Sequence, residues 1–326
     1  MPNLLLTNKC NRACAYCFAR DKVFDETPQA DLSFDNLIYV ADFLERSGDK
    51  QLGILGGEPT MHPQFNLYLK YLVSRGFHLT VFTNGIVEEG LAAQIRSMLD
   101  DAHAAHVNFT VNINEEKYRS QRENRLQANF LQVMGEKAML GFNIFEKDFS
   151  PEFLVETIKT HNLKRQIRLG IASPITLKKN SFASTDDYPK VYRTILELAE
   201  LCSKEDILLH PDCGFLLCGF SDEELGKLFK YGVALKFYCQ TPLDIGPDLH
   251  TWRCFPLSNV KSKSLKDFSD INEVRNYFDD VFEWAKGVGV FGECADCAHL
   301  KNGRCAGGCI GHFLDANSEM LGAGNE

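Results

Sequence analysis

Strand-like and helix-like segments alternate over residues 3 to about 210 of this 326-residue chain. The strand-like segments lie at residues 4–7, 52–55, 77–82, 107–113, 139–145, 167–171 and 207–210. Apolar residues at helical spacing lie between them, as in the stretch after Ser33, which can cap a helix. Repeated strand–helix units predict parallel strands joined by crossover helices. Six or so units predict an α/β fold with a partial (β/α)6 barrel and with chemistry at the carboxyl ends of its strands.

The character of the chain changes after His210. Nine of the twelve cysteines lie at or beyond Cys202, and short segments with glycine and proline become frequent. One clear helix start remains, where Ser221 and Glu224 have the spacing of a capping box. We expect a barrel domain over residues 1–210 and a smaller domain over residues 211–326 that is organised by metal rather than by a large core.

Composition restricts the compartment and the partners that we expect. The formal net charge of −9 gives an average field that repels nucleic acid and anionic lipid. A strand-like run begins almost at Met1, with no secretory signal before it, and every apolar run is shorter than the ~18 residues of a membrane span. Thiols stay reduced in such a cytoplasmic protein, so twelve cysteines favour metal or redox chemistry over disulfides.

Three cysteines follow the first strand directly. Cys10, Cys14 and Cys17 have the spacing C-x3-C-x2-C. Four thiolates are the usual ligand set of a 4Fe–4S cluster, so three would leave one iron open to a second molecule. A zinc site is the competing metal interpretation, but three cysteines without a nearby histidine do not complete a tetrahedral set. Three unrelated core cysteines are the remaining alternative.

This loop resembles the signature of the radical S-adenosylmethionine (SAM) superfamily, including the aromatic Tyr16 before the last cysteine. The end of the second strand, Gly56-Gly57-Glu58-Pro59, resembles the family's motif for the methionine amino group of SAM. The resemblance assigns further SAM contacts to strand ends, namely Thr83, Asn84, Asn112 and Gly170. Each of these could instead be a turn or strand-end residue that satisfies backbone groups.

The resemblance also implies the chemistry. A reduced cluster, supplied by an electron donor such as flavodoxin or ferredoxin, would cleave SAM to methionine and a 5′-deoxyadenosyl radical. That radical would abstract hydrogen from an unactivated C–H bond of the substrate. The cofactors would carry this chemistry, and the protein would supply position and exclusion of water.

A second group of cysteines resembles the SPASM extension of radical SAM enzymes, which carries auxiliary 4Fe–4S clusters. Its members are Cys239, Cys254, Cys294, Cys297, Cys305 and Cys309. The spacing before Cys305 is longer than the commonest version, and the usual last cysteine downstream of Cys309 is absent. The resemblance implies one or two auxiliary clusters, and a structural zinc site is the alternative.

Counting thiols bears on the number of auxiliary clusters. Without the first three cysteines and the helical Cys202, eight remain, enough for two four-cysteine clusters if Cys213 and Cys218 are ligands. Alternatively, one of two clusters keeps an open iron or takes Asp315 or His312 as a ligand. A single auxiliary cluster is a further alternative. Cys213 and Cys218 would then be buried thiols or catalytic donors of a hydrogen atom.

Two further features have both a functional and an ordinary interpretation. Asp212 follows a strand end and could act as a catalytic general base or as a turn residue. A basic helix near residues 115–134 could be solvated surface, an anchor for the SAM carboxylate or a dock for an acidic peptide. Its cations are Lys117, Arg119, Arg122 and Arg125.

These features together predict a radical SAM enzyme that oxidises or cross-links a ribosomally made peptide. Because the barrel begins at residue 3, we expect a separate protein or the basic helix to recognise a peptide leader. The alternative is a small-molecule radical SAM dehydrogenase or epimerase. A metal-stabilised binding module without chemistry is the third hypothesis, and the first cysteine loop argues against it.

Overall fold

A computed structural model describes residues 1–19, 31–100, 106–233, 235–239 and 242–319. In these residues, strands join in one sheet of order β10-β9-β8-β1-β2-β3-β4-β5-β6-β7, and neighbours from β1 to β7 are parallel. The seven parallel strands are β1 (Asn3–Leu5), β2 (Gln51–Leu55), β3 (His78–Thr83), β4 (Val107–Asn112), β5 (Ala138–Ile144), β6 (Gln166–Ile171) and β7 (Leu208–Pro211). The expected α/β fold with a parallel sheet is confirmed.

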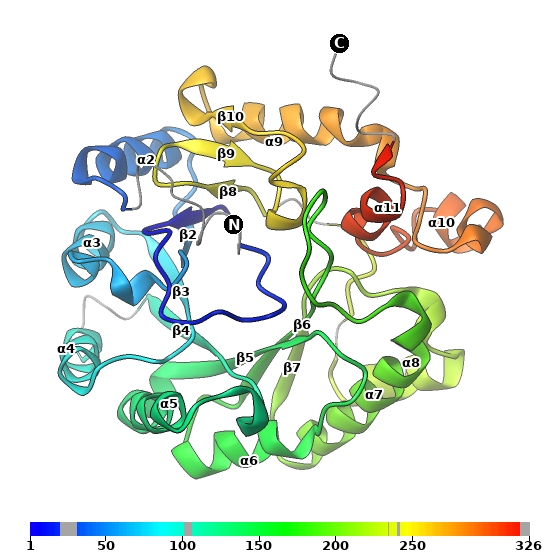
Figure 1. Ribbon diagram of the computed structural model, residues 1–326, viewed down its shortest axis with the longest axis horizontal. Coiled ribbons are helices and arrows are strands. Elements are labelled where there is room, and N and C mark those ends of the chain that lie inside the picture. The colour runs from blue at the N-terminus through cyan, green and yellow to red at the C-terminus, as the bar shows by residue number, and fades with distance from the viewer. Residues whose placement is uncertain (20–30, 101–105, 234, 240–241, 320–326) are drawn as a thin grey trace.

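Helices surround the curved sheet on its outer side (Figure 1). Those between the parallel strands are α2 (Phe34–Arg46), α3 (Phe65–Ser74), α4 (Glu89–Leu99), α5 (Gln121–Met134), α6 (Glu152–His161) and α7 (Tyr188–Lys204). The later helices are α8 (Asp222–Lys230), α9 (Ile271–Val281), α10 (Ala298–Lys301) and α11 (Ile310–Ala316). Ser33 caps α2 and Ser221 caps α8 through a capping box, as predicted. No helix of the described residues is long and apolar enough to cross a membrane.

The predicted basic helix over 115–134 is wrong at its start. Ser120 caps α5 with a capping box to Glu123, so the helix begins at Gln121. Lys117 lies in a separate 3-10 turn over Glu116–Tyr118, and Arg119 ends that turn with extended backbone. A side chain that accepts from the backbone N–H groups of a first helical turn fixes where the helix starts. The four cations therefore do not form one helix face.

Strand alternation places apolar side chains against the helices and polar ones inside the barrel. On β4, Phe109 and Val111 are buried in the main core, whereas Asn112 is only half-buried. Asn112 pairs with Gly141 of β5, and a Cβ at Gly141 would strike its amide oxygen. In the same way, a Cβ at Gly170 of β6 would lie 2.7 Å from Oδ1 of Asn143. These glycines leave room for asparagines on the inner wall of the barrel.

Three short strands from the later part of the chain extend the sheet beyond β1. They are β8 (Asp244–Ile245), β9 (His250–Trp252) and β10 (Lys263–Ser264). β8 is parallel to β1, with Asn3 opposite Asp244, and the Asn3 amide donates to Asp244 Oδ1 at 2.7 Å. The sequence did not predict these strands, because two or three residues are too few to show alternation. The division into domains at residue 210 stays a prediction.

Asp244 makes stability depend on pH. Its side chain is 2% exposed, and burial raises the pKa of this carboxyl to about 7. An aspartate in an unfolded chain has a pKa of about 3.9, so the folded state binds the proton more tightly. Its contribution to the unfolding free energy is greatest below pH ~4 and is lost as pH rises through ~7. We expect Asp244→Asn to remove this loss, which gives a stabilisation relative to wild type that grows by a few kcal/mol between pH 5 and 8.

Anaerobic chemical denaturation across that pH range measures the effect. Asp296→Asn, at a side chain that is 98% exposed, is the matched control and should follow wild type. A difference between Asp244→Asn and wild type that stays constant from pH 5 to 8 would contradict the prediction.

Candidate functional site

The first cysteine loop leaves β1 and lies across the mouth of the barrel (Figure 1). Cys10, Cys14 and Cys17 are all partly accessible, and the Cys17 N–H donates to the Cys14 carbonyl at 3.1 Å. Burial, together with the nearby Glu58, Cys17 and Cys14, raises the pKa of the Cys10 thiol to about 12. The structure therefore brings the three predicted thiols together at the carboxyl end of β1, where they fit a shared cluster.

Gly56 and Gly57 hold this loop against the end of β2. The Gly57 N–H donates to the Thr7 carbonyl and the Glu58 N–H to the Lys9 carbonyl, both at 2.8 Å. A Cβ at Gly57 would strike the Lys9 carbonyl and lie 2.9 Å from Cys10 Cβ. Only glycine permits so close an approach of two backbones. In this structure the glycine pair positions the cysteine loop, and its predicted contact with SAM stays a prediction.

Glu58 ties the ends of β2 and β3 together. Its side chain is 1% exposed, and its Oε1 accepts from the Thr60 N–H at 3.2 Å and from the Thr60 and Thr83 hydroxyls at 2.7 Å. The Asn84 N–H donates to Oε2 at 2.7 Å. Burial raises the pKa of this carboxyl, and these donors oppose the rise because they stabilise the charged form. Any ligand ammonium would share the carboxylate with these protein donors.

Asn84 joins the end of β3 to the cysteine loop. Its amide nitrogen donates to Asn11 Oδ1 at 2.8 Å and lies 4.0 Å from the Cys10 sulfur. Asn11 in turn donates to the Ile86 carbonyl at 2.8 Å. The ends of three strands and the cysteine loop thus form one hydrogen-bonded unit. Sequence reasoning missed Asn11, although its position directly after Cys10 was a signal.

Tyr16 anchors the far side of the loop. Its ring stacks on Phe145 with centroids 4.7 Å apart, and its hydroxyl lies 3.0 Å from the Asn114 amide. Burial raises the pKa of the Tyr16 phenol, so it stays neutral. Asn114 was missed because it lies beyond the predicted end of the fourth strand.

Two arginines lie beside this loop. Arg12 is 3.5 Å from Glu123. Burial raises the pKa of the Cys14 thiol, and the Arg12 guanidinium opposes this rise. Arg119 donates to Gln127, and its Nε is buried with no hydrogen-bond partner among the described residues. Burial and the neighbouring Arg12 lower the pKa of Arg119. The pair gives the site positive charge at the carboxyl end of β4.

The inner wall continues across β4 to β7. The Asn112 side-chain oxygen is buried and has no hydrogen-bond partner in the described part of the chain, so it offers a free acceptor. Further round, Arg168 lies over the Phe82 ring at 5.1 Å and forms an ion pair with Asp212. Asp212 is therefore paired with a cation rather than standing alone as a candidate base.

The later cysteines separate into two neighbourhoods. Burial raises the pKa of the Cys239 and Cys254 thiols, and the nearby Cys309 adds to this rise. Cys309 is also an electrostatic neighbour of Cys213, which is exposed. We call Cys213, Cys239, Cys254 and Cys309 the first quartet. Cys218 is exposed, and its thiol neighbours are Cys305, Cys294 and Cys297. We call these four the second quartet.

Glycines bring the second quartet together. Gly289 and Gly307 are in backbone contact, and the Val290 N–H donates to the Gly307 carbonyl at 2.9 Å. A Cβ at Gly289 would meet the Cys294 side chain, and the Gly307 N–H donates to the Cys305 sulfur at 3.3 Å. The remaining thiol, Cys202, is buried in α7 outside both quartets.

The described residues hold no group of three or more His, Cys, Asp or Glu side chains close enough for a single metal ion. The four thiolates of a 4Fe–4S cluster bind four different irons, so they surround the cluster and need not converge on one point. His312, considered above as a ligand, lies 3.2 Å from the Tyr188 hydroxyl.

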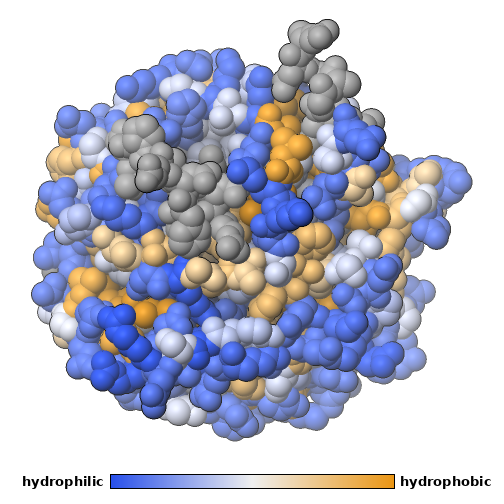
Figure 2. All heavy atoms as spheres, in the orientation of Figure 1, coloured by the Kyte–Doolittle hydropathy of each residue, from blue (hydrophilic) through white to orange (hydrophobic). Residues whose placement is uncertain are grey.

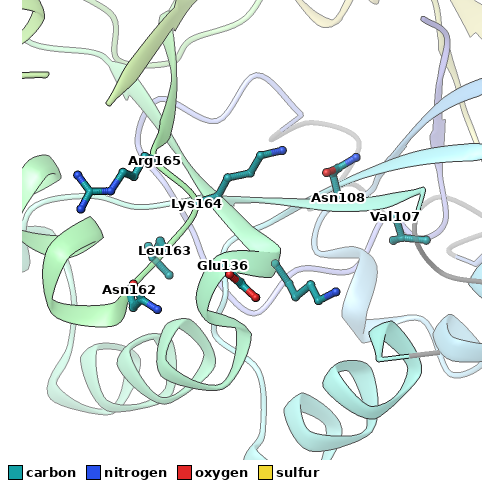
Figure 3. A pocket seen from close by; sticks show the side chains of 8 residues that line it. Val107, Asn108, Glu136, Asn162, Leu163, Lys164 and Arg165 are labelled. Carbon is teal, nitrogen blue, oxygen red and sulfur yellow. The ribbon is translucent and has the colours of Figure 1, made fainter. Parts of the chain in front are cut away.

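The mouth of the barrel, where the cysteine loop lies, is distinct from a hollow at the other end of the strands. The face seen in Figure 1 has a band of apolar residues across its middle inside a hydrophilic rim (Figure 2). A hollow of about 430 Å³ lies instead where β4, β5 and β6 begin, at the amino ends of the strands. Val107, Glu136, Lys164 and Arg165 are among its lining residues (Figure 3). It is therefore separate from the cysteine loop.

Residues 4–138, less than half of the chain, match the family model of the Radical SAM superfamily. Over 84 residues the chain is 39% identical to the S-adenosylmethionine-dependent nucleotide dehydratase of Selenomonas ruminantium, a match to 26% of this chain and 29% of that protein. It is 33% identical over 82 residues to the subtilosin biosynthesis protein AlbA of Bacillus subtilis, covering 24% of this chain and 17% of AlbA. The matches thus span less than a third of either relative.

Solved structures share the fold over nearly the whole chain. Streptococcus suis SuiB bound to precursor peptide SuiA has a TM-score of 0.66 at 15% identity, over 96% of this chain and 72% of SuiB. Native anSMEcpe with bound AdoMet has a TM-score of 0.64 at 12% identity, over 99% of this chain and 96% of that one. At these identities the likeness is one of fold.

The glycine contact predicts a cluster-assembly defect. We expect Gly57→Ala to displace the Lys9 carbonyl and Cys10, because the added methyl would overlap the loop backbone. Such overpacking typically costs about 1–3 kcal/mol. Anaerobic iron analysis of the reconstituted variant should show a loss of ~4 irons, one cubane. Gly90→Ala, in α4 with open space around the added methyl, is the control and should keep its iron. Full iron content in Gly57→Ala would show that the loop tolerates the methyl.

Proposed function

We propose that this chain is a radical SAM enzyme whose first cluster is held by Cys10, Cys14 and Cys17 and binds SAM at its open iron. The observation that carries the proposal is the cysteine loop fixed by backbone hydrogen bonds to the end of β2, within the matched domain. When bound, the cluster and SAM supply a 5′-deoxyadenosyl radical by one-electron cleavage.

The chain's own residues would hold SAM in place around this loop. Asn112 and Gly170, on the inner wall, are the proposed contacts for the ribose and the adenine of SAM, and the Asn112 side-chain oxygen has no partner among the described residues. Arg119 carries a buried donor without a partner and can bind the SAM carboxylate. Tyr16 and Glu58 act by fixing the loop and the strand ends.

Two auxiliary 4Fe–4S clusters account for the remaining thiols other than Cys202. Each quartet supplies the four thiolates of a complete cluster. In this arrangement Cys218 takes the place of the cysteine that the SPASM pattern has downstream of Cys309. Such clusters can accept an electron from a substrate radical, which suits a net oxidation or a cross-link.

The proposed substrate is a ribosomally made peptide. SuiB, whose fold this chain shares, has been solved with a precursor peptide, and AlbA serves bacteriocin biosynthesis. A separate leader-recognition protein and a flavodoxin or ferredoxin electron donor complete the proposal. A small-molecule substrate is the second candidate, because the Selenomonas relative is a nucleotide dehydratase.

Iron and sulfide analysis of anaerobically reconstituted protein tests the cluster count. Three cubanes predict ~12 irons, falling to ~8 in the Cys10/Cys14/Cys17→Ala variant. Cys213→Ala and Cys218→Ala should each weaken a different auxiliary cluster, and we expect about 4 irons fewer in each. Cys202→Ala is the matched control and should retain ~12.

Other iron contents would indicate a different number of clusters or a different metal. A fall from ~8 to ~4 irons would indicate one auxiliary cluster and leave one quartet as free thiols. Zinc in place of iron, or no loss in the triple variant, would overturn the proposal.

Mass spectrometry separates the two substrate classes. Wild-type enzyme, SAM and reductant are incubated with candidate precursor peptides or with nucleotides. Loss of two hydrogens from a peptide supports oxidation or cross-linking. Unproductive SAM cleavage with peptides, together with turnover of a nucleotide, would exclude the peptide class.

A further inference from the structure

Arg253 is a fully buried charged side chain beside the first quartet. It is 1% exposed and directly precedes Cys254. Its backbone carbonyl accepts from the Leu243 N–H at 3.0 Å, which holds it beside β8. Burial of a guanidinium is costly unless anions and hydrogen-bond acceptors surround it.

Among the described residues, one shared carboxylate and one sulfur are the partners of this guanidinium. Nη1 lies 3.3 Å from Asp279 Oδ1, and that carboxylate is 41% exposed and equally close to Lys286. Nη2 donates to the Cys239 sulfur at 3.8 Å. Nε is buried with no hydrogen-bond partner in the part of the chain that the structure describes. One carboxylate is thus shared between two cations and solvent.

The thiols of the first quartet can supply the negative charge that would balance Arg253. Arg253 opposes the rise in pKa that burial causes at Cys239 and at Cys254, so its positive charge acts on both sulfurs. A four-thiolate 4Fe–4S cluster carries net negative charge, which grows by one on reduction. Hydrogen bonds to the sulfurs and burial are the terms that set its potential.

We propose that Arg253 raises the reduction potential of the auxiliary cluster in the first quartet, through its hydrogen bond to the Cys239 sulfur and its buried positive charge. The inference rests on the proposed auxiliary cluster. Arg253 acts through the cluster and is a positioning and tuning residue. The effect favours transfer of an electron from a substrate radical to this cluster.

Redox titration monitored by electron paramagnetic resonance tests the proposal on the reconstituted full-length protein. We expect Arg253→Gln to make one-electron reduction of this cluster at least about tenfold less favourable, a shift of about 59 mV to more negative potential. Arg253→Lys keeps the charge and should recover part of the shift. Arg275→Gln is the matched control and should leave the potential unchanged. Arg275 lies in α9 and pairs with Asp49.

Asp279→Asn provides a test of opposite sign that leaves every ligand and Arg253 in place. Removing the carboxylate should shift the potential to more positive values. If Arg253→Gln loses iron, Arg253→Lys and Asp279→Asn decide the question. Unchanged potentials at wild-type iron content would overturn the tuning role. Full iron in Cys239→Ala would instead show that the proposed cluster is absent, which is a separate failure.

Discussion

Two backbone hydrogen bonds between the first cysteine loop and the end of β2 hold the site together. They require that β2 approach the loop without side chains between them, which Gly56 and Gly57 allow. Glu58 then fixes the end of β3 by accepting from the Asn84 N–H, and the Asn84 side chain donates to Asn11 of the loop. The thiols are therefore placed by the sheet itself, whose parallel strands end at one edge, rather than by the loop alone.

Local spacing made part of this arrangement predictable. Three thiols within eight residues must lie on one loop, and Gly56–Glu58 marks a strand end, so both could be read from the sequence. The division of the later cysteines could not be, because Cys213 and Cys218 are five residues apart yet lie in different quartets. Only the fold decides which distant thiols each one approaches.

Other misses have similar causes. An arginine next to a cysteine gives no sign that it is buried, so Arg253 was overlooked. The basic helix begins later than predicted because Ser120 caps it, although the run of cations starts at Lys117. β8 to β10 are too short to show a pattern, although β8 joins the later residues to β1 through Asp244. Parallel strands and crossover helices were predictable because each spans several residues with a clear period.

Two asparagines on the inner wall of the barrel each lie opposite a glycine on the next strand. Asn112 needs Gly141, and Asn143 needs Gly170, because the amide occupies the space of the missing side chain. Neither partner can be replaced alone without a clash or an empty space. In the evolution of such a barrel, these positions would have to change in pairs, so a switch of ligand at this wall requires coordinated substitutions on adjacent strands.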